Sequence, residues 1–356
     1  MQFLALYFPI LLLCFSRFYL TTFQTAFLIA SYAFFLSYIR TFGADYWDYV
    51  TTFESYTMAY SFFMDGSLEP FWLLLVKFNE LFLFDFHVGY GITAFLSVYI
   101  RVLAICIFFK FSKNLAFIGI LVFIANDFII RDLGQIRNGL ASSFFILFLS
   151  LYYNQSSSLK KFLTASFGIF SHYASFFGIA IFYLAAKIRG IYFFIISLLY
   201  GVSLFSFLYF SQQISEFIRP YSLILSLIID KLYQYTSSEI YIDDTASPIF
   251  IYIAILVSSL IFFVRKKLSD FEFILYKVYL FAPLTFFVLY SYPVLSNRLS
   301  TFILSLNCLM IPIALKYVSF NFNSESRTLI FVSTTIFFMF IGTFYMDRYL
   351  KIFFPY

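Results

Sequence analysis

Residues Gly91–Phe109 read GITAFLSVYIRVLAICIFF, an apolar run interrupted by a single charged side chain, Arg101. A transmembrane helix needs about 20 predominantly apolar residues, and this run meets that length. It ends at the short basic connector Lys110–Lys113, and a second apolar run begins at Leu115. The pattern predicts two membrane-spanning helices joined by a tight, positively charged loop.

The same pattern extends over the whole chain. Of its 356 residues, 62% are hydrophobic and 12% are charged, whereas a soluble domain keeps roughly a quarter of its residues charged. Such a chain cannot cover itself with a water-compatible surface, so lipid must solvate it. We predict an all-α, polytopic integral membrane protein, one transmembrane domain over residues 1–356, with roughly 11 (10–12) transmembrane helices.

The expected spans are Phe3–Phe15, Phe18–Ile39, Gly91–Phe109, Leu115–Ile130, Leu140–Tyr153, Phe162–Ala186, Ile191–Phe210, Pro248–Val264, Phe271–Tyr292, Leu299–Tyr317 and Thr328–Tyr345. Phe71–Phe86 is apolar but carries several polar side chains, and is expected to be re-entrant or tilted. Residues 40–68 and 211–247 mix aromatic with charged residues, which predicts external segments lying along the headgroup plane. The three cysteines lie far apart in apolar runs and are expected to be buried thiols.

Short basic connectors predict the orientation. Lys110–Lys113, Lys160–Lys161 and Arg265–Lys267 belong in the cytoplasm by the positive-inside rule. Alternation then places Arg131–Asn138 and Tyr292–Arg298 outside. This alternation of inside and outside loops fails once, because Lys187 and Arg189 follow Lys161 after one apolar stretch. Either Phe162–Ala186 is a broken helix that turns near His172, or one basic cluster is misassigned.

Ionisable side chains gather on the side predicted to be external, with Arg101 and His172 deeper in apolar runs. Such groups cost several kcal/mol at membrane depth and persist mainly where they line a polar cavity. External arginines are the most informative, because a guanidinium matches phosphate oxygens in a bidentate way. Helices beginning near Arg137 and Arg298 would add N-terminal N–H groups to an anion site. A lipid-linked phosphate or pyrophosphate is the predicted ligand; the alternative is structural pairing, as of Arg131 with Asp132.

Five short motifs follow one another along the chain. They are Arg40-Thr-Phe-Gly-Ala-Asp45-Tyr-Trp-Asp48-Tyr49, Glu69-Pro70-Phe71-Trp72, Gln135-Ile-Arg137-Asn-Gly139-Leu-Ala141, His172-Tyr-Ala-Ser and Asn297-Arg298-Leu. In order and spacing they resemble the EpsG/Wzy group of bacterial polysaccharide polymerases, over about Arg40–Leu299. The sequence departs from the pattern modestly, with Ala44 beside Asp45 and Asn138 after Arg137.

The resemblance implies a GT-C-like glycosyltransferase of the bacterial inner membrane that acts in lipopolysaccharide biosynthesis. Such an O-antigen polymerase moves a growing glycan from undecaprenyl pyrophosphate to a lipid-linked repeat unit at the periplasmic face. The implied partners are the undecaprenyl-pyrophosphate-linked oligosaccharide, the lipid bilayer and a chain-length-regulating co-polymerase, with no nucleic acid. No metal or cofactor is expected, and the chain's only histidines, His87 and His172, exclude a multi-His metal site.

Candidate site residues follow from the motifs and from the charge that develops on the leaving group. The candidates for binding pyrophosphate are Arg137 and Arg298 first, then Arg131, Arg40 and Arg101. The candidates for binding sugar are Asp48, Gln135 and Asn297. The catalytic base is expected among Asp45, Glu69 and His172.

Each candidate base also has a plainer interpretation. His172 in an apolar helix could be a packing histidine, since a neutral imidazole is the cheapest titratable group to bury. Glu69 before Pro70 could cap the following helix. Asp45 could bind a sugar or pair with Arg40. These alternatives stay open at the level of sequence.

Two other function classes fit part of the pattern. An O-antigen ligase shares the donor and differs in the acceptor, and residues 211–247 would be a modest version of its large external loop. A lipid-linked oligosaccharide flippase or a secondary transporter would place its cations in a central cavity with two-half symmetry. No such symmetry is visible in the sequence, and the cations lie toward one predicted side. The sequence therefore favours the polymerase.

Overall fold

The computed structural model describes residues 2–39, 46–47, 49–51, 70–82, 85–188, 192, 211–218, 220, 248–289, 293–319 and 324–353. Every regular element in this part is helical, with no strand, so the predicted all-α class is confirmed for it. The elements are α1 (Gln2–Tyr19), α2 (Thr22–Tyr38), α4 (Pro70–Leu81), α5 (Phe86–Phe108), α6 (Lys113–Phe123), η1 (Ile124–Gly134), α7 (Ile136–Tyr153), α8 (Ser158–Ser171), α9 (Ala174–Lys187), α11 (Ser211–Ile218), α13 (Pro248–Val264), η3 (Arg265–Lys267), α14 (Asp270–Val288), α15 (Pro293–Leu304), α16 (Asn307–Ser319) and α17 (Ser324–Phe353).

Polar side chains set where the apolar helices begin. The Asp85 carboxylate accepts a hydrogen bond from the Val88 N–H at 2.9 Å, which starts α5. The Ser112 hydroxyl accepts from the Leu115 N–H at 3.3 Å, which starts α6 after the basic connector. The first N–H groups of a helix have no partner inside it, and hydrocarbon offers none. These caps therefore place the helix ends at the polar boundaries of the apolar runs.

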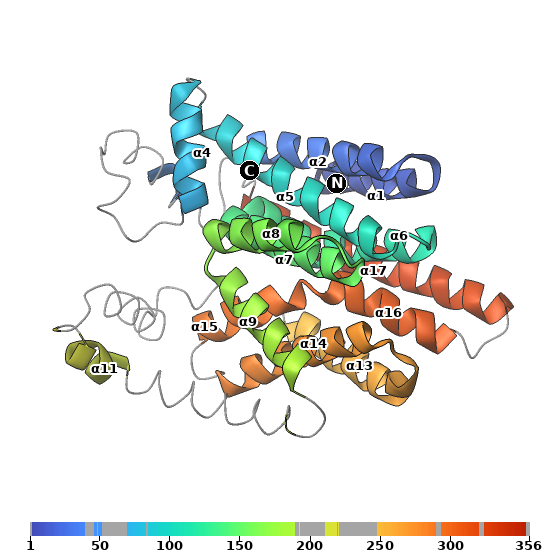
Figure 1. The fold of residues 1–356 in the computed structure, drawn as a ribbon. Coiled ribbons are helices and arrows are strands. Elements are labelled where there is room, and N and C mark those ends of the chain that lie inside the picture. Colours follow the sequence, from blue (N-terminus) through green and yellow to red (C-terminus); the bar gives the residue numbers. More distant parts are fainter. Residues whose placement is uncertain are drawn as a thin grey trace. The chain divides into compact units, whose positions relative to one another are not determined.

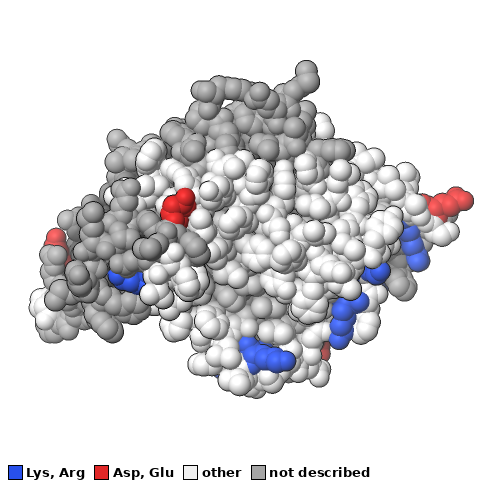
Figure 2. Space-filling model, turned by 90° about the horizontal axis from the view of Figure 1, so that it is seen from above, with Lys and Arg blue, Asp and Glu red and all other residues white. Residues whose placement is uncertain are grey.

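The chain is a multi-pass membrane protein. Five helices of the described part are long and apolar enough to cross a bilayer, and they are Phe86–Phe108, Lys113–Gly134, Ile249–Lys267, Asp270–Val288 and Ser324–Thr343. Figure 2 shows broad uncharged areas between few Lys, Arg, Asp and Glu side chains, as expected where lipid is the solvent. The count of roughly 11 spans and the GT-C-like fold stay predictions.

The chain divides into two compact units. Unit 1 comprises residues Met1–Ile179 and Ser305–Tyr356, and unit 2 comprises Ala180–Leu304. Unit 2 is therefore continuous in sequence and interrupts unit 1. A single transmembrane domain over residues 1–356 stays a prediction.

In unit 1, α5 is the central helix, with α2 along one side and α7 along another (Figure 1). Next to it, α6 packs along α16, and η1 contacts both α7 and α17. Gly119 on α6 allows the first of these contacts, because a Cβ there would lie 2.7 Å from the carbonyl oxygen of Cys308 on α16. Small residues at helix crossings let backbones approach closely in membranes.

In unit 2, α14 packs against both α13 and α15. The buried ammonium of Lys277 on α14 donates to the carbonyls of Ala185 and Ile188, the latter at 2.8 Å. Ala185 lies in the last turn of α9 and Ile188 directly follows the helix, at the end where a helix leaves its last acceptors unpaired and favours a cation. Lys277 thus caps α9 from a neighbouring helix, which explains a lysine within an apolar span.

The apolar segment Phe162–Ala186 is broken into two helices. This is one of the two explanations offered for the failed alternation of inside and outside loops. Helix α8 ends at Ser171, His172 is extended with φ −166° and ψ 136°, and α9 begins at Ala174. The description of His172 as lying inside a helix is therefore wrong. The N–H of Ser175 donates to the carbonyl of His172 at 3.0 Å, so the break is closed by a local turn.

The predicted span Leu299–Tyr317 is also two helices, α15 and α16, separated at Ser305–Leu306. Helix α15 begins at Pro293, so Arg298 lies in the interior of this helix. The sequence had instead predicted that Arg298 lies near a helix N-terminus. Proline is well suited to the first helical turn, because its missing N–H would be unpaired there anyway. Pro293 thus starts the helix before Arg298, and the prediction that a helix begins near Arg298 is wrong.

Several expected segments lie mostly outside the described residues. Of Ile191–Phe210 only Tyr192 is described; of residues 40–68, only 46–47 and 49–51; and of 211–247, only α11 and residue 220. The predicted interfacial character of these segments stays a prediction.

The predicted orientation can be tested with single cysteines. Cys14, Cys106 and Cys308 are all buried, as expected, so a cysteine-free background is a reasonable starting point. Phe111, in the basic connector, is 92% exposed, and Trp47 is 58% exposed. We expect a membrane-impermeant maleimide to label Trp47→Cys in intact cells and Phe111→Cys only after permeabilisation. The reverse pattern would show that the chain is inserted the other way round.

Candidate functional site

A junction of two unlike helices in unit 1 carries a group of buried, charged side chains. The π-helix η1 continues the apolar helix α6 and ends at Gly134, and α7 begins at Ile136. The Gln135 N–H donates to the Ile130 carbonyl at 2.9 Å, one residue further back than in an α-helix. Such π-helical segments are rare in proteins, and those that exist are frequently found at functional sites.

Arg101 lies at the centre of this junction, fully buried in the middle of α5. Its Nε donates to the Ser143 hydroxyl at 2.9 Å and its Nη1 to the Asp127 carboxylate at 2.8 Å. Its Nη2 donates to the Gly139 carbonyl at 3.1 Å and to the Ser142 hydroxyl. All three nitrogens are engaged inside the protein, which offsets the cost of burying the charge. Arg101 therefore ties α5 to both η1 and α7.

Two buried carboxylates of η1 complete the network. Asp127 also faces Arg131 one helical turn away, with 3.4 Å between its Oδ1 and the arginine Nε. Asp132 accepts a hydrogen bond from the Ser97 hydroxyl on α5 and lies 3.9 Å from Arg101 Nη2. Two arginines thus face two aspartates, so this part of the described structure buries charges of both signs in balance.

The network bears on two predicted pyrophosphate ligands. Arg101 has its donors occupied by other parts of the chain, and Arg131 is 3% exposed beside Asp127. The geometry favours a positioning role for Arg101, since a phosphate would have to displace its partners. The alternative to phosphate binding was that Arg131 pairs with a carboxylate, for example that of Asp132. In the structure the carboxylate beside Arg131 is that of Asp127. Contact of either arginine with pyrophosphate stays a prediction.

Gly139 lets the first turn of α7 touch η1. A Cβ at this position would lie 2.8 Å from the Arg131 carbonyl oxygen and 3.0 Å from the Asp132 Cα. Because both neighbours are backbone atoms, a larger residue would push the two helices apart. The same approach brings the Gly139 carbonyl to Arg101. Gly139, two residues after Arg137, thus has a packing role, because it lets α7 contact η1.

Arg137 is the second residue of α7, so its predicted place at a helix N-terminus is confirmed. The side chain is half-buried, and its guanidinium carbon lies 5.2 Å from the centroid of the Tyr49 ring. That distance is within the range of a cation–π interaction. Beside it, the Asn138 amide donates to the Gln135 side-chain oxygen at 3.3 Å. A fixed guanidinium next to the positive end of a helix forms an electrostatic environment for an anion.

Aromatic side chains support this turn from the N-terminal end of α5. The Tyr90 hydroxyl lies 2.9 Å from the Leu133 carbonyl oxygen and 3.0 Å from the Gly134 carbonyl oxygen, the last two acceptors of η1. The Tyr90 ring lies 5.7 Å from the Tyr49 ring, and both belong to one buried apolar cluster with Ile136 at the start of α7. Tyr49 is thereby joined to the end of η1.

The structure thus brings four predicted site residues together: Arg101, Arg131, Gln135 and Arg137. His172 lies at the break between α8 and α9. Asn297 and Arg298 are described only by their backbone in α15, and Arg40, Asp45, Asp48 and Glu69 lie outside the described residues.

Sequence reasoning missed Asp127, Tyr49 and Tyr90 as members of this site. Asp127 lies four residues before Arg131, a spacing that makes side chains neighbours on a helix and could have revealed the pair. No local signal marks the two tyrosines in a chain with 30 of them. Among the described residues, no three His, Cys, Asp or Glu side chains are grouped as metal ligands would be, and metal independence stays a prediction.

The chain matches one protein family over nearly its whole length. The model of the EpsG family covers residues 5–356. Comparison with curated proteins and with solved structures found no match. The family match extends beyond the motif region Arg40–Leu299 and confirms the resemblance that the motifs predicted. The chain therefore belongs to the EpsG family.

Proposed function

We propose that this EpsG-family chain is an O-antigen or related polysaccharide polymerase of the bacterial inner membrane. It transfers a growing glycan from undecaprenyl pyrophosphate to a lipid-linked repeat unit at the periplasmic face. Membership of the EpsG family points to a polysaccharide-polymerase-type role. The observation that carries the finer proposal is Arg137, a guanidinium held over Tyr49 in the first turn of α7.

The proposed reaction is a displacement at the anomeric carbon of the donor sugar. A hydroxyl oxygen of the acceptor forms the new bond to that carbon, and the bond from the carbon to the pyrophosphate oxygen breaks. The electron pair of the broken bond leaves with undecaprenyl pyrophosphate, and the hydroxyl proton passes to a base. Negative charge therefore grows on the leaving group, and preorganised cations aimed at it supply a large part of the catalysis.

Arg137 meets the requirements of such a cation. Its planar guanidinium can bind two phosphate oxygens at once, and the helix N-terminus beside it favours an anion. The ring of Tyr49 fixes it from one side. The close contact of Gly139 with η1, and the hydrogen bond from Arg101 to the Gly139 carbonyl, hold the first turn of α7 against η1 and α5. Arg298 remains a second proposed pyrophosphate ligand.

Three residues are proposed for the base, Asp45, Glu69 and His172, and near-isosteric substitutions separate them. Asp45→Asn, Glu69→Gln and His172→Gln keep size and remove basicity at neutral pH. Loss of a general base typically costs 10²- to 10⁴-fold, which is enough to reduce a polymer ladder to single repeat units. We expect this result for Asp45→Asn or Glu69→Gln and a retained ladder for His172→Gln, because an amide can replace one imidazole contact. Full ladders from all three variants would mean that no protein base is needed.

A lipopolysaccharide gel of the deletion strain tests the function itself. A strain without the polymerase should attach single repeat units to lipid A core, and the wild-type gene should restore the ladder. A strain without a ligase would attach no repeat unit at all. Core without any repeat unit in the deletion strain would therefore contradict the proposal in favour of the ligase.

A further inference from the structure

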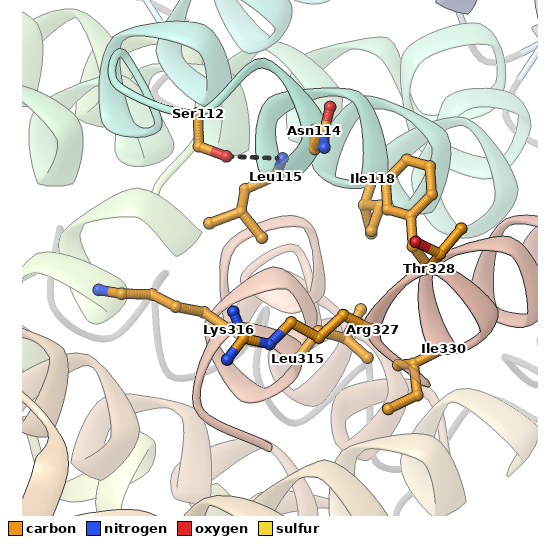
Figure 3. A pocket seen from close by; sticks show the side chains of 10 residues that line it. Ser112, Asn114, Leu115, Ile118, Leu315, Lys316, Arg327, Thr328 and Ile330 are labelled. Carbon is orange, nitrogen blue, oxygen red and sulfur yellow. Dashed lines mark hydrogen bonds between the residues drawn. The ribbon is translucent and has the colours of Figure 1, made fainter. Parts of the chain in front are cut away.

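A pocket of about 390 Å³ lies between three helices of unit 1, away from the polar junction. Its walls come from the start of α6, the second half of α16 and the first turns of α17. The volume lies within the range of small-molecule sites. Figure 3 shows Ser112, the residue before α6, and Asn114 of α6 on one side, and Lys316 of α16 and Arg327 of α17 on the other.

Two cations line this pocket, from different helices. Lys316 is half-buried on α16, and its ammonium donates to the neighbouring Tyr317 hydroxyl at 3.2 Å. Arg327 is exposed near the start of α17. The nearest acid in sequence is Glu325, which is exposed but does not line the pocket.

Apolar side chains form much of the remaining lining, and the pocket borders α17, a mostly exposed helix. Its lining includes Ile118 of α6 and Phe331 of α17. The span of α17 is buried for only 17% of its residues. Further along that helix, Ile336 is 61% exposed and Phe340 is 71% exposed. A ligand that fits such a site has an anionic head between the cations and apolar chains along α17.

The pocket and the polar junction lie at opposite ends of one continuous span. Helix α6 starts at Lys113, beside the pocket, and its continuation η1 ends at Gly134, beside Arg137. A helix of this length, Lys113–Gly134, extends over about 30 Å, which is the thickness of the hydrocarbon core. The two sites therefore face opposite membrane surfaces, and the pocket is not part of the candidate functional site.

From this arrangement we infer that the pocket binds the phosphate headgroup of an anionic glycerophospholipid, in the leaflet opposite the candidate functional site. Basic pockets between transmembrane helices bind such headgroups through charge and hydrogen bonds. The bound lipid connects α6, α16 and α17, and so holds in place a helix whose own surface is mostly exposed. The inference does not depend on the reaction proposed above.

Native mass spectrometry of the purified full chain tests this inference. The probes are phosphatidylglycerol and phosphatidylcholine with the same acyl chains, added to delipidated protein in detergent. We expect one tightly bound phosphatidylglycerol and no comparable phosphatidylcholine. Each Lys or Arg near an anionic lipid contributes about 1 kcal/mol, so Lys316→Gln with Arg327→Gln should weaken the tight site about 30-fold. The matched control, Lys160→Gln with Lys161→Gln, removes two cations from α8 and should leave it unchanged.

Three results would overturn the inference. Equal binding of both lipids would show that the headgroup charge is not recognised. An equal loss in the control pair would show general surface attraction. Displacement of the lipid by inorganic phosphate at low millimolar concentration would assign the pocket to a free anion. If the double variant does not fold, the wild-type protein still decides, because phosphatidylglycerol and not phosphatidylcholine should raise its thermal unfolding midpoint.

Discussion

Replacing Arg137 by lysine is expected to reduce the polymer to single repeat units while the protein stays in the membrane. Lysine keeps the positive charge but loses the planar fork that binds two phosphate oxygens and stacks on Tyr49. Removal of one preorganised donor at a developing charge costs about 10²- to 10³-fold in rate. The measurement is the length distribution of lipopolysaccharide in a deletion strain that carries the variant, with the membrane content of the protein determined in parallel.

Variants of Tyr49 and Arg298 sharpen this prediction. Tyr49→Phe keeps an aromatic face beneath the guanidinium and should retain most of the ladder, whereas Tyr49→Leu removes that face and should shorten it. Arg298→Lys should resemble Arg137→Lys if Arg298 is a second pyrophosphate ligand. Wild-type ladders from both lysine variants would rule out bidentate recognition of phosphate by these residues.

Removing Arg101 should have the largest effect on stability in unit 1. Arg101→Met is close in size but leaves the buried carboxylates of Asp127 and Asp132 without the cation that they share. Breaking a buried ion pair on one side typically costs about 3–5 kcal/mol. We expect low protein levels in the membrane and a clear fall in the thermal unfolding midpoint of purified protein. Lys266→Met, which removes an exposed cation in η3, serves as the control and should change neither.

A second substitution distinguishes lost charge balance from lost packing. Arg101→Met with Asp127→Asn leaves Arg131 and Asp132 as the charges of the network, one of each sign. The double variant should therefore be more stable than Arg101→Met alone, with a coupling of about 0.5–3 kcal/mol in a double-mutant cycle. Additive losses would show that the two side chains act independently, and the network would then not be a single unit.

Much of the fold follows from apolar length, and the differences have local physical causes. The run Gly91–Phe109 predicted its helix to within five residues at each end, because hydrocarbon allows little besides helix. The break in Leu299–Tyr317 was missed because Ser305–Leu306 contains neither glycine nor proline. A polar residue in an apolar run, such as Ser305, is equally compatible with a continuous helix.

The candidate site was harder to predict because its members are joined by tertiary contacts. Spacing marks Ser97 with Arg101 and Asp127 with Arg131 as one-turn neighbours on two helices. It does not show that the two helices face each other, nor that Gly139 lets α7 approach the backbone of η1. The wide turns of η1 also have no periodic pattern in the sequence by which they could be predicted.

The interruption of unit 1 by unit 2 also has a consequence for biogenesis. The surface of α6 around Gly119 emerges from the ribosome about 190 residues before its partner Cys308. At about 5–20 residues per second, this gap lasts roughly 10–40 s. By contrast, the network from Ser97 to Ser143 comes from α5, η1 and α7, which are made in succession. The charges of this network can therefore neutralise one another early in synthesis. The surface that stays unpacked until the last helices are made is the apolar surface of α6 around Gly119.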